Sequence, residues 1–412
     1  MTDYDNSVAG LDRRHFLTGA GAAGLVTATG LVPWSAAEAA VPSAGSAERR
    51  LGLRVPPLWS AADRHGLVYG SSTATWQISD KAYAKLFARH AALLFTEDDL
   101  LWYRLKPTPD SDLDFSFGDR IIEFAERHHQ IVLGAHLVWD EGFGEGWTED
   151  DLFGMSEKRA REVLFGTMRA TLQRYRGRVA AWIVVNEAIV NGTDESHHGL
   201  RMDVPWFQTI GPEYVGHAFD IAREEDPHAL LVLNDFGYET VNEFRDRPED
   251  KQRATLQVID RLLERGHPVQ AFGIQAHLLA DRFHQRFHGP TYRRFLRELA
   301  DRGLKILITE MDVLDDGLPA DRERRDRMVA GIYRHYLDVA LEEPAVKALV
   351  SFGLSDRYTW LQEDFPRDDD APRRPLAFGD GMRAKPAYRA ILRGLRHAPN
   401  RRRGLHARRQ VG

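Results

Sequence analysis

Two glutamates far apart in the sequence each follow an apolar run that is typical of a buried strand. Glu187 ends the run VVNE, and Glu310 lies within ITEMD. An ionised carboxylate buried without a partner is strongly unfavourable, so each glutamate belongs at a cleft or in a polar network. Each alone is equally well explained by a structural salt bridge. Together, they match the pair of carboxyl groups that hydrolyses a glycosidic bond, one as acid and the other as nucleophile or base.

Further polar and aromatic side chains follow other apolar runs of the same kind. They are His136, Trp139, Asn234, Gln275, His277 and Trp360. A single histidine in such a position is usually an interior group with its hydrogen bonds satisfied. A set of amide, imidazole and indole groups around two carboxyls suits a sugar ring, because polar atoms bind its hydroxyls and aromatic faces cover its C–H surface.

The runs that precede these residues number eight and alternate with segments of helical periodicity. They cover residues 67–74, 92–95, 131–138, 179–185, 230–234, 271–278, 305–313 and 348–354. Continuous apolar runs of this length indicate parallel strands buried on both faces. Alternation with helices predicts an α/β fold, a single-domain (β/α)8 TIM barrel, whose active site lies at the carboxyl ends of the strands.

In a closed barrel the fourth and seventh strands face each other across the opening, which would bring Glu187 and Glu310 together. The alternative is an open, doubly wound sheet, which would place a glycine-rich turn after the first strand. The first run ends instead in Ser71-Ser72-Thr73-Ala74.

Composition excludes several other functions. The chain has 412 residues, 43% of them hydrophobic, and a formal net charge of −6, which argues against a general nucleic-acid or membrane-surface binder. The absence of Cys excludes disulfides, thiolate zinc sites, iron–sulfur clusters and a cysteine nucleophile.

The competing interpretation is a metal-dependent barrel. However, the sequence has no H-E-x-x-H motif, and the pairs His197-His198 and His128-His129 fall in expected loops or helix ends. We therefore expect no cofactor or metal and a monomeric chain.

The first forty residues are typical of an export signal. Arg13-Arg14 precedes Phe16-Leu17, a mildly apolar stretch and an A-x-A site at Ala37 and Ala39. This predicts a twin-arginine-type signal peptide over 1–39 and a secreted or periplasmic protein, with no membrane contact after cleavage. A linker and N-terminal segment (40–66), the catalytic domain (67–397) and a basic tail (398–412) complete the expected organisation.

Several of these runs carry motifs that resemble one family. AWIVVNEAI (181–189) is similar to W-D-V-V-N-E-A and LITEMDV (307–313) to I-T-E-L-D, both from glycoside hydrolase family 10, the retaining endo-β-1,4-xylanases. FGIQAHL, LVLNDFGYE, GLSDRYTWL and RPLAFGDGMRAKPAY resemble further segments of that family in the same order. The resemblance extends from about residue 67 to residue 395.

The resemblance implies roles for individual residues. Glu187 would be the acid/base and Glu310 the nucleophile, Asn186 would bind the sugar 2-hydroxyl, and Gln275 and His277 would bond the nucleophile side. The substrate-binding set implied by the motifs and strand ends is Glu97, Asp98, His136, Trp139, Asn186, Asn234, Gln275, His277 and Trp360. The expected partner is a β-linked polysaccharide or oligosaccharide.

The sequence departs from the family pattern where the glycone, the sugar on the nucleophile side of the cleaved bond, would bind. Asp98 and Leu101 replace an Asn and a Lys, Ala135 replaces a His, and Phe352 replaces a Trp. We therefore expect a secreted retaining β-glycosidase that acts on β-1,4-linked xylan or xylo-oligosaccharides with altered glycone recognition. The alternatives are a weak or inactive saccharide-binding barrel, or a glycosidase for another β-glycan.

Overall fold

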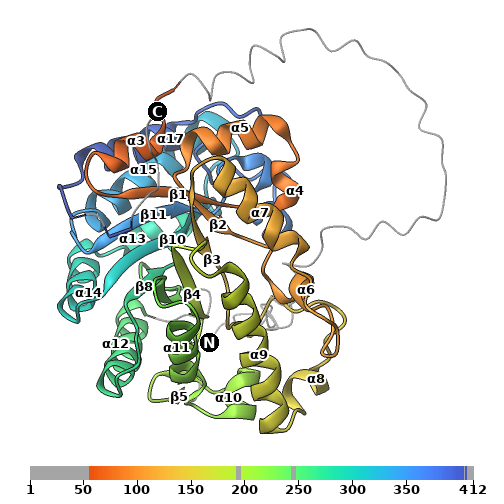
Figure 1. Cartoon of the computed structure of the whole chain (residues 1–412). Coiled ribbons are helices and arrows are strands. Elements are labelled where there is room, and N and C mark those ends of the chain that lie inside the picture. Colours follow the sequence, from red (N-terminus) through yellow and green to blue (C-terminus); the bar gives the residue numbers. More distant parts are fainter. Residues whose placement is uncertain (1–54, 192–195, 243–246, 403, 406–412) are drawn as a thin grey trace, which may run out of the picture.

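Eight parallel strands close into a barrel in the computed structural model, which describes residues 55–191, 196–242, 247–402 and 404–405 (Figure 1). The barrel strands are β1 (Val68–Thr73), β2 (Leu93–Thr96), β3 (Ile131–Gly134), β4 (Ala181–Asn186), β7 (Leu230–Asp235), β8 (Ala271–Ile274), β10 (Lys305–Leu314) and β11 (Val346–Ser351). Each strand pairs with the next, and β11 pairs with both β1 and β10. This closure confirms the predicted (β/α)8 barrel.

Helices surround the barrel. They are α3 (Leu58–Asp63), α4 (Thr75–Ile78), α5 (Lys81–His90), α6 (Trp102–Leu105), α7 (Ser116–Arg127), α8 (Glu149–Phe153), α9 (Glu157–Tyr175), α10 (Pro205–Ile210), α11 (Tyr214–Glu225), α12 (Pro248–Glu264), α13 (Ala280–Arg286), α14 (Gly289–Asp301), α15 (Arg322–Ala340), α16 (Leu361–Asp364) and α17 (Pro386–His397), with a 3₁₀ turn at Asp356–Tyr358. Local signals set their starts: Asp80 and Asp321 cap α5 and α15 by accepting from backbone N–H groups, and proline opens α12 and α17.

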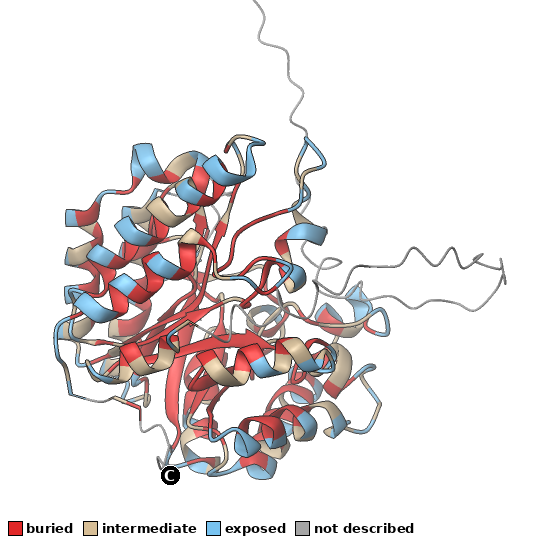
Figure 2. Ribbon diagram, turned by 90° about the horizontal axis from the view of Figure 1, so that it is seen from above, coloured by how far each residue is buried: buried red, intermediate tan, exposed pale blue. Residues whose placement is uncertain are grey.

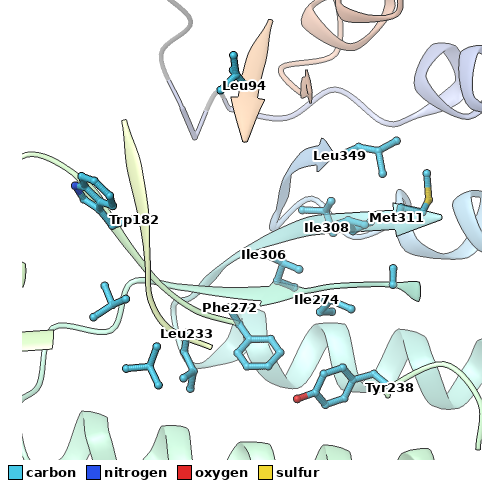
Figure 3. Packing of buried hydrophobic residues seen from close by; sticks show 14 of the residues in the cluster. Leu94, Trp182, Leu233, Tyr238, Phe272, Ile274, Ile306, Ile308, Met311 and Leu349 are labelled. Atoms are coloured by element: carbon cyan, nitrogen blue, oxygen red, sulfur yellow. The ribbon is translucent and has the colours of Figure 1, made fainter. Parts of the chain in front are cut away.

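Alternation along each strand divides the apolar side chains between two layers. On β4, Ala181 and Ile183 join the cluster inside the barrel, whereas Trp182 and Val184 join the larger cluster beneath the helices. Figure 3 shows part of that outer layer, with Trp182, Leu233 and Phe272 among its members. Seen from above, the barrel strands are almost entirely buried, whereas the helices carry exposed residues on their outer faces (Figure 2). Two packed layers thus hold the strand ends in fixed positions.

Three local features differ from the expected runs. Strand β3 ends at Gly134, and only Val138 of the following residues pairs again, with Val185. The sixth run divides into β8 and β9 (His277–Leu279), because Ala276 adopts a φ of 61° and interrupts the extended backbone. A two-stranded hairpin, β5 (Ser196–His197) and β6 (Leu200–Arg201), was not expected from the sequence. All three lie next to the mouth, where they shape the site.

The C-terminal tail packs against the barrel in the part of it that the structure describes. The predicted signal peptide, 1–39, lies outside the described residues. In the predicted basic tail, Arg401 donates to the carbonyl oxygens of Leu341 and Val346, both at 2.7 Å, and Leu405 joins the cluster inside the barrel. Among the helices described, none combines the length and apolar character needed to cross a bilayer.

Candidate active site

Glu187 lies directly after β4, where the chain leaves the extended conformation. Its φ is 54°, in the left-handed region that non-glycine residues rarely adopt. Neighbouring residues of a strand normally point to opposite faces, but here Asn186 and Glu187 both face the side-chain amide of Gln275, whose Nε2 donates to Glu187 Oε1 at 2.7 Å and to Asn186 Oδ1 at 3.4 Å. Trp139 Nε1 donates to Glu187 Oε2 at 3.0 Å. Both carboxyl oxygens of Glu187 are therefore held in place.

Glu310 lies within β10, at an irregularity in its pairing with β11. Asn234 Nδ2, from the end of β7, donates to Glu310 Oε1 at 2.8 Å, and His277 Nε2 lies 3.4 Å from Glu310 Oε2. The residue is 4% exposed. The glutamate predicted as nucleophile is thus oriented by side chains from two other strands.

The two glutamates belong to one network of amides. Thr309 Oγ1 donates to Asn234 Oδ1 at 2.7 Å, so the Nδ2 of Asn234 faces Glu310 and also donates to Asn186 Oδ1 at 2.7 Å. Gly273 permits this arrangement, because a Cβ at that position would lie 2.1 Å from Asn234 Oδ1.

Asn186 leaves one polar atom of this network without a protein partner. The residue is 3% exposed, its Oδ1 accepts from neighbouring amides, and its Nδ2 is buried with no hydrogen-bond acceptor. A buried donor without a partner is unfavourable. This N–H group, whose residue contacts Asn234 and Gln275 of the carboxyl network, is therefore a candidate donor to a ligand.

Burial raises the pKa of Glu187 to about 7, while the donated bond from Gln275 opposes this rise and the charges of Asp235, Asp140 and Glu310 add to it. A carboxyl with this pKa is mostly protonated below neutral pH and remains partly protonated at pH 7, as a general acid requires.

Behind Glu187, a cation fixes the backbone of the turn. Arg201, from β6, donates to the Glu187 carbonyl oxygen at 3.0 Å and to Asp140 Oδ2 at 2.7 Å. The unpredicted hairpin therefore has a function in the site, since it carries the guanidinium that supports the strained residue.

His277 connects Glu310 to a second carboxylate. Its Nδ1 lies 2.9 Å from Asp312 Oδ1, and Trp360 Nε1 donates to Asp312 Oδ2 at 2.8 Å. Burial acts to lower the pKa of His277, but Asp312 and Glu310 outweigh it and raise the pKa well above its ordinary value. The imidazolium therefore places a positive charge beside Glu310.

The predicted glycone residues follow β2. Glu97 accepts from Ser72 Oγ at 2.6 Å and from Gln77 Nε2 at 2.9 Å. Burial, together with the charge of Asp98, raises the pKa of Glu97 to about 8.

Asp98 accepts from Tyr103 Oη at 2.6 Å on one oxygen. On the other oxygen it accepts from Trp76 Nε1 at 3.0 Å and from Arg104 Nη2 at 2.8 Å. The oxygens of Asp98 are thus occupied by protein donors.

The remaining predicted residues line the same mouth. His136 is buried against Phe95 and Trp139, and burial lowers its pKa to about 4, so the ring is neutral. Leu101 is buried too. The ring of Trp360 packs against His277 and Phe352.

The structure thus brings together the two glutamates with Asn186, Asn234, Gln275, His277 and Trp139, all of which sequence reasoning selected. One detail differs from the resemblance: the Gln275 amide donates to Glu187 rather than on the nucleophile side. Sequence reasoning missed the partners that hold Glu97 and Asp98 and the role of Arg201, because no periodic or motif signal marks them. Within the described part of the chain, three or more His, Asp or Glu side chains nowhere gather as a metal site.

The sequence model of Glycosyl hydrolase family 10 matches residues 58–394. This chain belongs to glycosyl hydrolase family 10. The match extends from α3 into α17 and therefore includes the whole barrel. The (β/α)8 barrel with a glutamate at the end of β4 and another in β10 is the family's glycoside hydrolase framework, as the resemblance of the motifs implied.

Known proteins with similar sequences and structures include several xylanases. The chain is 30% identical over 327 residues to endo-1,4-beta-xylanase B of Thermotoga neapolitana, covering 77% of this chain and 84% of that protein. It is 27% identical to exoglucanase XynX of Acetivibrio thermocellus and spans about a quarter of that longer protein, 27% of its length.

Among solved structures, native xylanase 10B from Thermotoga maritima has a TM-score of 0.71 at 30% identity, covering 82% of this chain and 98% of that one. Xylanase 10B from Thermotoga petrophila in complex with xylobiose has a TM-score of 0.71 at 29% identity, with 83% and 98% covered. These likenesses extend over the barrel that carries the two glutamates.

Proposed function

We propose that this protein is a retaining β-glycosidase that hydrolyses β-1,4-linked xylan or xylo-oligosaccharides. The main support for the proposal is that two carboxyls of one network lie in different environments. Burial raises the pKa of Glu187 to about 7, whereas Glu310 lies between the amide of Asn234 and the charged imidazole of His277. When the environments of two neighbouring carboxyls move their pKa values apart, the one with the raised pKa can act as the acid and the ionised one as the nucleophile.

The mechanism follows from these assignments. Glu310 attacks the anomeric carbon while Glu187 gives its proton to the leaving oxygen, which forms a covalent glycosyl-enzyme and releases the aglycone. Glu187, now ionised, takes a proton from water, and that water releases the sugar with its original anomeric configuration. We assign the unpartnered Nδ2 of Asn186 as the donor to the sugar 2-hydroxyl, a bond that strengthens in the transition state.

The substrate class rests on the family and its relatives. A xylanase structure similar to this one is described in complex with xylobiose, and the similar proteins include both endo-1,4-beta-xylanases and an exoglucanase. The test is to incubate the purified protein with xylan, glucuronoxylan, β-glucan and aryl β-glycosides and to identify the products. Release of xylo-oligosaccharides supports the proposal, whereas binding without product release from any β-glycan would assign a saccharide-binding module instead.

Altered glycone recognition is part of the same proposal. Leu101 supplies no cation, and Asp98, which replaces an amide, directs its oxygens at protein donors. We expect a decorated xylo-oligosaccharide or another β-linked sugar to bind at least as well there as unsubstituted xylan. Relative kcat/KM values for linear and substituted xylo-oligosaccharides measure this directly.

We also propose export by the twin-arginine route, motivated by Arg13-Arg14 ahead of the apolar stretch. Changing both to Lys keeps the charge but removes the guanidinium pair. The precursor of the double variant should remain in the cytoplasm, as fractionation and immunoblotting would show. Unchanged secretion would refute the route without bearing on the catalytic assignment.

A further inference from the structure

Trp76 is one of two large apolar residues that are prominently exposed in the described part of the chain. It is 44% exposed, and the other, Phe153, is 40% exposed. Single exposed apolar side chains are common and need no explanation by themselves. What distinguishes Trp76 is that its indole is fixed by the protein while it remains exposed.

Two contacts fix the ring. Its Nε1 donates to Asp98 Oδ2 at 3.0 Å, and its plane is nearly perpendicular, at 86°, to the ring of Tyr358, with centroids 5.5 Å apart. A perpendicular contact covers at most one face of an indole. Within the described residues Tyr358 is the ring that contacts Trp76, and 44% of the residue is exposed, so much of the indole surface remains open in a defined orientation.

The groups that hold Trp76 are themselves anchored. Asp98 also accepts from Tyr103 and Arg104, and the backbone N–H and hydroxyl of Thr75 each donate to Asp99 at 2.8 Å. Tyr358 Oη donates to Asp80 at 3.0 Å. Little conformational entropy is then lost when a ligand covers the open face.

The position of Trp76 is at the mouth of the barrel. It follows β1, Asp98 follows β2 and Tyr358 follows β11, and these three strands are neighbours in the sheet. The segment of Tyr358 continues into Trp360, which donates to Asp312 of the catalytic network. Glu97, which precedes Asp98, lies on the side that the resemblance assigns to the glycone.

We propose that the open indole face of Trp76 is a saccharide platform that stacks against a pyranose ring of a β-linked glycan, beyond the glycone subsite at Glu97. This inference rests on the proposed function and deepens it. Glu97, Asp98 and Leu101 form the part of the mouth that we call the glycone floor. There, Leu101 has no hydrogen-bond donor and the oxygens of Asp98 already accept from protein groups. An aromatic face suits this floor because it binds the C–H surface of a sugar without needing a hydrogen-bond donor. Glycone recognition thereby depends on stacking more than on hydrogen bonds.

The test compares long with short substrates. For Trp76→Ala, the ratio of kcat/KM for xylohexaose to that for xylotriose should fall about tenfold, as expected from losing one stacking contact. Trp76→Phe should restore most of the ratio, and Phe153→Ala, which removes the other exposed aromatic, should leave it unchanged. An unchanged ratio in a folded Trp76→Ala protein would overturn the platform.

A binding measurement separates this inference from the proposed function. Titration with xylohexaose or cellohexaose should shift the tryptophan fluorescence of the wild type, and the part of the shift contributed by Trp76 should be missing in Trp76→Phe. That result supports the platform even if no xylan is cleaved, which would refute the proposed function alone. Identical fluorescence changes in both proteins, or none in either, would overturn the platform whatever the activity.

Discussion

The catalytic centre and the glycone floor lie in adjacent parts of the same mouth, but their hydrogen-bond donors are used differently. In the catalytic centre, donors from other strands hold the two carboxyls, and the Nδ2 of Asn186 has no protein acceptor. In the glycone floor, Tyr103, Arg104 and Trp76 all donate to Asp98. In the proposed function, the catalytic residues and the glycone-binding residues belong to different strand ends, so recognition could change while the catalytic pair is kept.

The largest expected effect is on the nucleophile. Glu310→Ala should lower kcat for every substrate by about 10⁴-fold or more, because among the described residues Glu310 is the carboxyl that accepts from Asn234. Initial rates on an aryl β-xylobioside measure the loss. Glu249→Ala, in the exposed first turn of α12, is the matched control and should retain full activity. Near-normal turnover by Glu310→Ala would remove it from this role.

The next effect depends on the leaving group. Glu187→Gln should lower kcat/KM on xylan by about 10²- to 10⁴-fold, but an aryl glycoside with an acidic phenol should be far less affected, since its leaving oxygen needs no proton. The pKa of Glu187 is about 7, so wild-type activity on xylan should fall as the pH rises through that value and the acid ionises. The variant should lose this alkaline limb, and retention of the limb would contradict the assignment.

A smaller effect is expected behind the nucleophile. Asp312→Asn removes the carboxylate that helps to raise the pKa of His277, so that pKa should fall and the imidazole beside Glu310 should lose its charge at a lower pH than in the wild type. Removing one charge-assisted bond of this kind should lower kcat about 10- to 150-fold. Imidazole NMR titration and kcat together test this, and an unchanged His277 pKa would show that Asp312 is only structural.

Substitutions in the glycone floor should increase activity on unsubstituted xylan. A Leu101→Lys, Asp98→Asn, Ala135→His variant restores the family's residues and should raise kcat/KM on unsubstituted xylan by up to about tenfold. Since Asp98 pairs with Arg104, the single Leu101→Lys variant is the cleaner comparison. If the wild type already cleaves linear xylan efficiently and neither variant improves, the altered floor has no effect on recognition.

The smallest effect concerns Glu97. Because burial raises its pKa to about 8, it is largely neutral below that pH, and Gln can accept from Gln77 in its place. Glu97→Gln should change kcat/KM less than about threefold at pH 6, whereas Glu97→Ala should lower it about tenfold. Equal losses in both variants would show that the charged form is required.

The sequence was most informative where periodic patterns and motifs coincide. Near-continuous apolar runs predicted the barrel, and the residues directly after them, such as Glu187 and Asn234, proved to share one network. It was least informative in the loops. Nothing in the sequence around Trp76 or Arg201 shows that one would reach Asp98 and the other Asp140, because such contacts depend on how separate loops meet in space.

We propose above all that Glu187 and Glu310 act by double displacement. Proton NMR during hydrolysis of a β-linked xylo-oligosaccharide, recorded before mutarotation, tests it most directly. Retention requires the β-anomer of the new reducing end to appear first and the α-anomer to follow slowly. Initial formation of the α-anomer would show single displacement with inversion and would contradict the account.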